Sequence, residues 1–271
     1  MKKLLFAVLC YGMISSVSAQ NTENGHEYVD LGLSVKWATC NVDANKPEDT
    51  GGYYSWGETN VKNEYLWSNY KYSNGSNRSI TKYCVDSEYG NEGFIDNKTT
   101  LELADDVAHQ KWGGHWRMPT NEDFMELLNK VNCKWEWTSY NGVDGYKVTS
   151  IKPGFEDNYI FLPAVGLYTE KGFLPYTNGY YLWTSSLGKF PSAGGVVLLT
   201  PISHELYIGL TRFSGLPVRP VYSPNITEEI NLDVSENTDN TNGGFRIGSL
   251  CVLIAIGVLV YFVYRRRKKS E

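Results

Sequence analysis

Short runs of alternating apolar and polar residues dominate the middle of the chain. In 29–42, Leu31, Leu33 and Val35 are separated by small or polar residues, which is typical of a strand with one buried face. Further runs of this kind follow at fairly even intervals, and most are bounded by Gly, Pro, Asn or Asp, the residues that favour turns. They cover 52–58, 134–138, 146–151, 159–162, 180–185, 196–200, 206–210 and 218–222. This spacing argues against repeated βαβ units and predicts many short antiparallel strands.

A helix is predicted directly after Pro119. Thr120 supplies a hydroxyl at the N-cap position, and Asp123 supplies a carboxylate three residues later, so the two can form a capping box. Apolar residues then recur at helical spacing, at Phe124, Leu127, Leu128 and Val131.

A second helix is predicted over 101–111. Its inner face would hold Leu101, Ala104 and Ala108, and its outer face Glu102, Asp105 and Asp106. The adjacent Asp105 and Asp106 could form a carboxylate pair for acid–base chemistry, but neighbouring residues of a helix point in different directions. We therefore expect a solvated helix face on which one aspartate has a capping or network role.

The first nineteen residues predict a secretory signal peptide. Two lysines precede an uncharged, mainly apolar stretch over 4–14, and Val17 and Ala19 are small residues at the positions that a signal peptidase requires. Cleavage after Ala19 would leave Gln20 as the new N-terminus.

The other end predicts a single membrane-spanning helix. Residues 247–264 are eighteen uncharged residues, which as a helix would extend about 27 Å. Five basic residues follow at 265–269, so the tail 265–271 should remain in the cytoplasm and the preceding domain should be exported. An alternative is that this end is a bacterial sorting signal, which a protease removes near Gly243 and Gly244.

Residues 225–246 are rich in Asn, Asp, Glu and Thr and predict a flexible acidic linker, so the folded domain should span 27–224. Residues 20–244 contain 17 lysines and arginines against 29 acidic residues, a net charge of −12. Phosphate backbones would repel such a domain, which excludes nucleic acid as a partner.

Six motifs occur in the folded region in a characteristic order. They are VDLGLSVKWATCNV (29–42), YYSWGE (53–58), DNKTTLELADDVAHQKWGGHWRMPT (96–120), IFLPAVG (160–166), YYLWTSS (180–186) and VRPV (218–221). In this order they resemble the bacterial major paralogous domain family (FISUMP), whose members are exported and similar to C-type lectin-like domains. The resemblance implies an α+β fold of many short antiparallel strands with two helices and long loops. It also implies that the first and last motifs pair side by side.

The sequence contains no arrangement of residues typical of an enzyme or a metal site. The four histidines, His26, His109, His115 and His204, are scattered, and no calcium-loop, phosphate-loop or nucleophile-elbow motif occurs. The run 116–120 is also similar to formylglycine-generating oxidases, but their C-terminal cysteine pair has no counterpart here. We therefore expect no enzymatic activity, no cofactor and no metal.

Aromatic residues suggest two roles. Six tryptophans lie in the motifs or alternate along predicted strands and should build the core: Trp37, Trp56, Trp112, Trp116, Trp135 and Trp137. Four tyrosines lie instead in or next to the Gly-, Pro- and Asn-rich region 166–181: Tyr168, Tyr176, Tyr180 and Tyr181. Because such loops can carry ligands, these four are the candidate ligand-binding residues, and a locally packed loop is the alternative.

The predicted function is therefore a membrane-tethered, exported binding module that recognises a glycan or a protein through its loops. The alternative is a structural or interaction component of the cell envelope without a small ligand. Cys40, Cys84 and Cys133 are expected to be inert free thiols, and a single disulfide among them is the alternative.

Overall fold

The computed structural model describes residues 21–175, 180–190, 192–200, 203–205 and 209–224, which belong to the compact unit Met1–Pro224. The predicted signal peptide, linker, membrane helix and basic tail lie outside these residues, as does Tyr176. Within the described ranges, no helix has the length and apolar character needed to cross a membrane.

The described domain is α+β, as predicted, with two α-helices and fourteen short strands whose pairings are all antiparallel. The helices are α1 (Val107–Trp112) and α2 (Asn121–Leu128). Single 3-10 turns occur at η1 (Trp67–Asn69), η2 (Asn91–Gly93) and η3 (Leu103–Asp105).

The two ends of the domain meet in a five-stranded sheet. Its strands, in spatial order, are β1 (Thr22–Glu23), β2 (His26–Val29), β3 (Lys36–Ala38), β14 (Val221–Tyr222) and β4 (Trp116–Arg117). Val221 faces Trp37 on one side and Arg117 on the other, so the first and last motifs do pair.

The prediction of one strand over 29–42 is wrong in its extent, because the structure has only the end of β2 and the short β3 in this range. The strand breaks between β2 and β3 because Gly32 has a φ of 71° and donates its N–H to the Asp30 side chain in a local turn. A side chain at Gly32 would lie 2.6 Å from the Phe155 ring, so the packing here also requires glycine.

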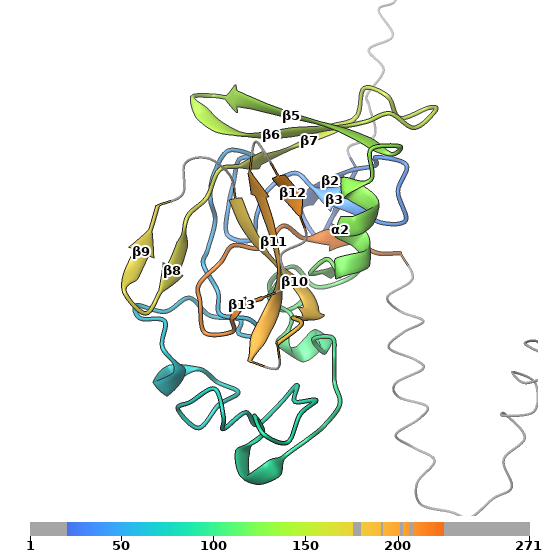
Figure 1. The fold of residues 1–271 in the computed structure, drawn as a ribbon. Helices are drawn as coiled ribbons and strands as arrows, with labels where there is room; N and C mark the ends of the chain where they lie inside the picture. Colours follow the sequence, from blue (N-terminus) through green and yellow to red (C-terminus); the bar gives the residue numbers. More distant parts are fainter. Residues whose placement is uncertain (1–20, 176–179, 191, 201–202, 206–208, 225–271) are drawn as a thin grey trace, which may run out of the picture. The chain divides into compact units, whose positions relative to one another are not determined.

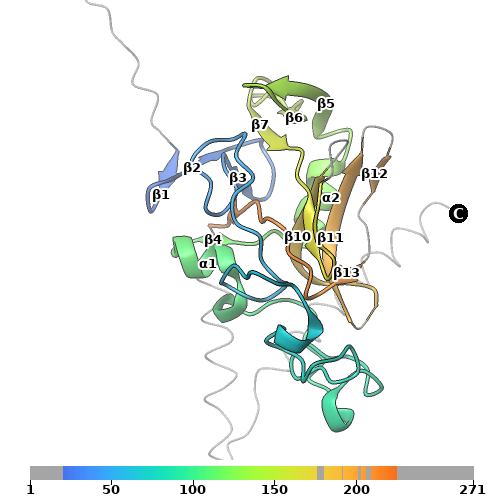
Figure 2. The same ribbon diagram turned by 90° about the vertical axis from the view of Figure 1, so that its left-hand side faces the viewer.

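Three further sheets complete the domain (Figures 1 and 2). One contains β5 (Cys133–Tyr140), β6 (Val143–Ser150) and β7 (Tyr159–Pro163). The second contains β10 (Tyr180–Leu187), β11 (Ala193–Thr200), β12 (Ser203–Glu205) and β13 (Leu210–Thr211). The third is a hairpin of β8 (Leu167–Thr169) and β9 (Gly172–Leu174). Both views place the β5–β7 sheet at one end and residues 60–100 at the other.

The core of the described residues consists of two large hydrophobic clusters and one small one. Trp56 and Trp183 lie in the first, Trp37 and Phe124 lie in the second, and Trp116 lies in the third. The prediction that tryptophans build the core is confirmed for four of the six. Trp135 and Trp137 are only half-buried and pack against the second cluster.

Helix α2 begins as predicted. The Thr120 hydroxyl accepts the N–H of Asp123, and the Asp123 carboxylate accepts the N–H of Thr120, so the capping box is complete. The helix ends at Leu128, and Val131 lies beyond it with an exposed side chain.

The second predicted helix differs from the structure. Residues 103–105 form the 3-10 turn η3, and α1 begins only at Val107, because Asp106 is extended and caps α1 by accepting the N–H of His109. The two aspartates are not solvated: Asp105 is 4% exposed and Asp106 is 2% exposed. The expected capping and network roles are confirmed, but the expected solvent-exposed face is wrong.

Two fully buried arginines connect distant segments of the domain. Arg219 donates to the Asn41 side chain and to the carbonyls of Ala38 and Phe161, and burial lowers its pKa to about 10. Arg212 donates to the carbonyls of Lys82 and Tyr83. Because a guanidinium has five donors in a fixed plane, each arginine can fix several backbone segments at once.

Candidate functional site

A cleft of about 220 Å³ lies between the β8–β9 hairpin and a loop more than a hundred residues earlier in the chain. Its walls are Asn63, Glu64, Tyr65 and Leu66 on the loop, and Tyr168, Thr169, Glu170 and Gly172 on the hairpin. Figure 1 shows the hairpin at one edge of the domain, where β8 pairs with β9 and Tyr168 also forms an antiparallel bridge with Gly215. The cleft therefore includes one of the four tyrosines that the sequence nominates.

Stacked aromatic rings from the two walls of this cleft contact each other. The centroids of Tyr65 and Tyr168 are 5.0 Å apart, and their stacked planes are inclined by 28°. The rings of Tyr53 and Phe173 meet Tyr168 at 5.1 Å each. One face of Tyr168 is thus covered by Tyr65, and three aromatic neighbours fix the position of its ring.

The loop that carries Asn63–Leu66 is held in place where its two ends meet, by the buried carboxylate of Glu58. Glu58 accepts hydrogen bonds from the Lys62 ammonium and from the backbone N–H of Lys71, both at 2.7 Å. The same ammonium donates to the carbonyl of Asn69 at 2.8 Å, and Tyr65 donates from its hydroxyl to the carbonyl of Tyr53 at 2.7 Å. These bonds close residues 58–71 into one compact loop and fix its tip beside the hairpin.

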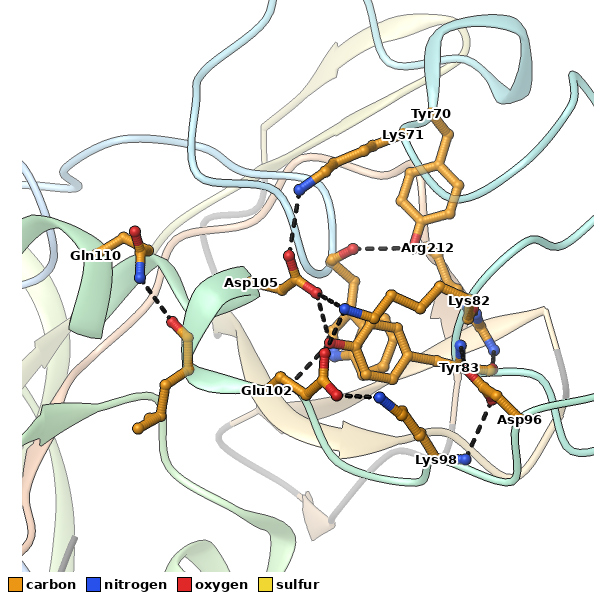
Figure 3. A network of polar contacts seen from close by, with 12 residues as sticks. Tyr70, Lys71, Lys82, Tyr83, Asp96, Lys98, Glu102, Asp105, Gln110 and Arg212 are labelled. Carbon is orange, nitrogen blue, oxygen red and sulfur yellow. Dashed lines mark hydrogen bonds and ion pairs between the residues drawn. The ribbon is translucent and has the colours of Figure 1, made fainter. Parts of the chain in front are cut away.

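A charged network centred on Asp105 fixes the rest of the long segment 60–100 (Figure 3). The Asp105 carboxylate accepts from the Lys82 ammonium at 2.6 Å, from the Tyr83 hydroxyl at 2.6 Å and from Lys71 at 3.2 Å. Lys82 also pairs with Glu102, which in turn pairs with Lys98 at the more exposed side. The network connects the segment that carries the cleft loop to η3 and the core.

The network shifts the titration of its members. Burial alone would raise the pKa of Asp105, but hydrogen bonds, led by the one from Lys82, outweigh burial and hold that pKa at about 2. Burial opposes the charge on Lys82 as well, and the carboxylates beside it still raise its pKa. Hydrogen bonds from Lys82 and Lys98 lower the pKa of Glu102. All three groups are therefore charged at neutral pH.

Within the cleft, by contrast, two carboxylates lack an ion-pair partner among the described residues. Glu64 and Glu170 are both exposed and lie on opposite walls. The nearest lysine on the loop, Lys62, is already paired with Glu58. The cleft thus combines the Tyr168 ring, an amide at Asn63 and two carboxylates that have no ion pair within the part of the chain that the structure describes.

A second hollow, of about 450 Å³, lies near α1 and is chemically different. Its lining includes His26, which stacks on Trp112 with ring centroids 3.8 Å apart. Its two charged residues, Asp43 and Lys111, pair with each other at 2.9 Å. Because this hollow neutralises its own charges, the cleft is the stronger candidate for a binding site.

The four tyrosines do not form one patch. Tyr180 is 0% exposed and lies in the second core cluster, 6.1 Å from the ring of Tyr146, so its nomination as a ligand-contacting residue is wrong. It is buried because it begins β10 on the same face as Leu182. Tyr181 is half-buried against the first cluster, Tyr168 lines the cleft, and Tyr176 lies outside the described residues.

The loop wall at Asn63–Leu66 was missed from the sequence. A signal was present, since Tyr65, Leu66 and Trp67 form a short apolar run between polar residues. No periodic pattern marked this stretch, however, because its residues are placed by the Glu58 contacts and not by a strand or helix.

The histidines and cysteines occupy structural positions. His109 and His115 hydrogen-bond to the Trp116 carbonyl and to Glu23, and His204 lies on β12. Cys40, Cys84 and Cys133 are free thiols, of which Cys40 is only half-buried. Burial raises the pKa of Cys133 to about 11. Among the residues that the structure describes, no three His, Cys, Asp or Glu side chains gather as a metal site.

Comparison with known protein families, with curated proteins and with solved structures gives no match to this chain. The fold and the cleft define a mixed α+β domain with a preformed surface cleft, built from two loops that other parts of the domain fix in place.

Proposed function

We propose that this chain is a membrane-tethered, exported binding module that recognises a glycan or a protein ligand at the Tyr168 cleft. The observation that carries the proposal is the meeting of residues 63–66 and 168–172 around a hollow of about 220 Å³. A preformed concave site with a few convergent polar groups is the usual form of a ligand site. The anchored loop supports this, because a wall that is already ordered loses little entropy when a ligand binds.

The proposed fold is the C-type lectin-like fold of the FISUMP resemblance. Its support is the pairing of the terminal strands at Val221 and Trp37, together with two helices and long loops. The membrane tether rests on residues 247–264 and the basic run after them, with a processed sorting signal as the alternative.

The test is a glycan array and a pull-down with the full chain in detergent, comparing wild type with Asn63→Trp. Asn63 is exposed and lines the cleft, so a tryptophan should fill the cleft and abolish capture without changing the unfolding temperature. The matched control is Asn74→Trp, an exposed asparagine that does not line the cleft. Equal capture by both variants would refute the cleft as the binding site.

The alternative function is a structural or interaction component of the cell envelope. The exposed Phe173 and Leu174 at the hairpin favour it, because exposed apolar side chains at a fixed position are typical of contacts between proteins. In that case no glycan would be retained on the array, and capture would depend on Phe173 and Leu174 instead of Asn63.

A further inference from the structure

The β8–β9 hairpin presents an apolar surface directly beside the cleft. Phe173 is 49% exposed and Leu174 is 52% exposed, yet the Phe173 ring is held against Tyr53 and Tyr168 at centroid distances of 5.9 and 5.1 Å. The Phe173 ring is thus both exposed and fixed in place, and the exposed Leu174 follows it in β9. Apolar anchors of this kind contribute most at protein interfaces, since little side-chain entropy is lost when they are covered.

An exposed apolar side chain, Val61, lies near the loop wall of the cleft. An open groove of about 590 Å³ adjoins the cleft and shares Asn63 and Glu64 with it. The groove is also lined by the exposed Val61, and by Lys62, whose ammonium is held by Glu58. The cleft and the groove together therefore present two carboxylates, Glu64 and Glu170, near the exposed apolar side chains of Val61, Phe173 and Leu174.

The charge of these two carboxylates determines the chemistry of the occupant. Glu64 and Glu170 have no ion pair with a described residue, and residues 20–244 carry a net charge of −12. Such a field attracts cationic partners and repels anionic ones. The hollow of about 220 Å³ lies below the roughly 300–1,000 Å³ typical of sites that enclose a whole small molecule, which suits one inserted side chain.

We infer that this surface binds a basic polypeptide segment, with a lysine or arginine side chain entering between Glu64 and Glu170 beside the Tyr168 ring. Apolar residues of the same segment then cover Phe173, Leu174 and Val61. These exposed apolar side chains favour a polypeptide over an amino sugar, which would satisfy the carboxylates but leave the apolar side chains exposed. The inference rests on the proposed function, in that it assigns a ligand class to the same cleft.

The test measures binding of a short fluorescein-labelled peptide in which lysine and leucine alternate, by fluorescence anisotropy on the full chain in detergent. The same peptide with acetylated lysines is the ligand control. The protein variants are Glu64→Gln, Glu170→Gln and the double variant. Glu88→Gln is the matched control, since Glu88 is an exposed glutamate outside the cleft and its substitution changes the net charge equally.

Each cleft substitution should lower the affinity for the lysine peptide about fivefold, and the double substitution about twentyfold. Glu88→Gln should leave the affinity unchanged, and the acetylated peptide should not bind. Equal losses in Glu88→Gln and the cleft variants would overturn the inference, because the attraction would then be a property of the overall charge. Absence of binding by the wild-type chain would overturn it as well.

A further arm with glucosamine oligosaccharides separates this inference from the proposed function. Binding of the oligosaccharide but not the peptide, with loss in Asn63→Trp, would refute a polypeptide ligand and leave the cleft as a binding site. Insensitivity of every captured ligand to Asn63→Trp would refute both.

Discussion

Replacement of Asp105 by asparagine should destabilise the domain by about 3 kcal/mol at neutral pH. The carboxylate is 4% exposed and accepts hydrogen bonds from Lys82, Tyr83 and Lys71. Lowering of its pKa from 3.8 to about 2 corresponds to roughly 2.5 kcal/mol. Loss of one partner from a buried ion pair costs about 3–5 kcal/mol, because the remaining charge stays buried. The two magnitudes agree to within a factor of two.

Thermal unfolding of the full chain, followed by near-ultraviolet circular dichroism, checks this value. In a domain of about 200 residues each kcal/mol shifts the Tm by about 2–4 °C, so Asp105→Asn should lower the Tm by about 6–12 °C. Lys98→Gln is the control: it removes a partly exposed member of the same network, and its effect should remain below about 1 kcal/mol.

The pH dependence provides a second check. Because the pKa of Asp105 is lower in the folded state than in the unfolded state, its carboxylate contributes fully above the unfolded pKa and loses that contribution as the pH falls through about 2. The stability difference between wild type and variant should therefore shrink as the pH is lowered from about 5 to about 2. A difference that is below about 1 kcal/mol at neutral pH, or that persists unchanged in acid, would refute this account of the network.

Three further predictions concern the core, the thiols and the topology. Tyr180→Ala should cost about 3–5 kcal/mol in urea unfolding, as expected for a buried aromatic ring, and a loss below about 1 kcal/mol would place the ring at the surface. After alkylation of the unfolded, unreduced chain, mass spectrometry should find Cys40, Cys84 and Cys133 all modified, whereas a disulfide would protect two of them. In the native chain at about pH 8, Cys133 should resist alkylation because its pKa is about 11. Protease added to intact spheroplasts should digest residues 20–244 and spare a tag after Glu271, and digestion of the tag would reverse the predicted orientation.

The sequence predicts best those features that local chemistry decides. The capping box at Thr120 and Asp123 is complete within four residues, so it could be identified without the fold. The burial of Trp37 and Trp56 follows from their size and their positions in apolar runs. The positions of Asp105 and Asp106 could not be found in this way, since their hydrogen-bond partners lie between 3 and 34 residues away and displace the expected helix.

The tyrosines also divide into one that local sequence could place and one that only distant contacts place. Tyr180 lies at the boundary between a Gly- and Asn-rich loop and a predicted strand, and composition favours the loop whereas alternation with Leu182 favours burial. The structure follows the alternation. Tyr168 lines a cleft whose other wall is more than a hundred residues away, and only tertiary contacts such as the Tyr65 stack bring the two walls together.

The central position of β14 has a consequence for how this domain is made. The last described strand lies between β3 and β4, so β3 is paired only with β2 and β4 has no strand partner in this sheet until Val221 and Tyr222 are in place. Because a chain is synthesised from its N-terminus, this sheet cannot close until the final residues of the domain are present. Every shorter intermediate exposes two unpaired strand edges, which are sites for association with other chains. Premature termination even a few residues before Pro224 should accordingly yield an aggregating product rather than a slightly smaller domain.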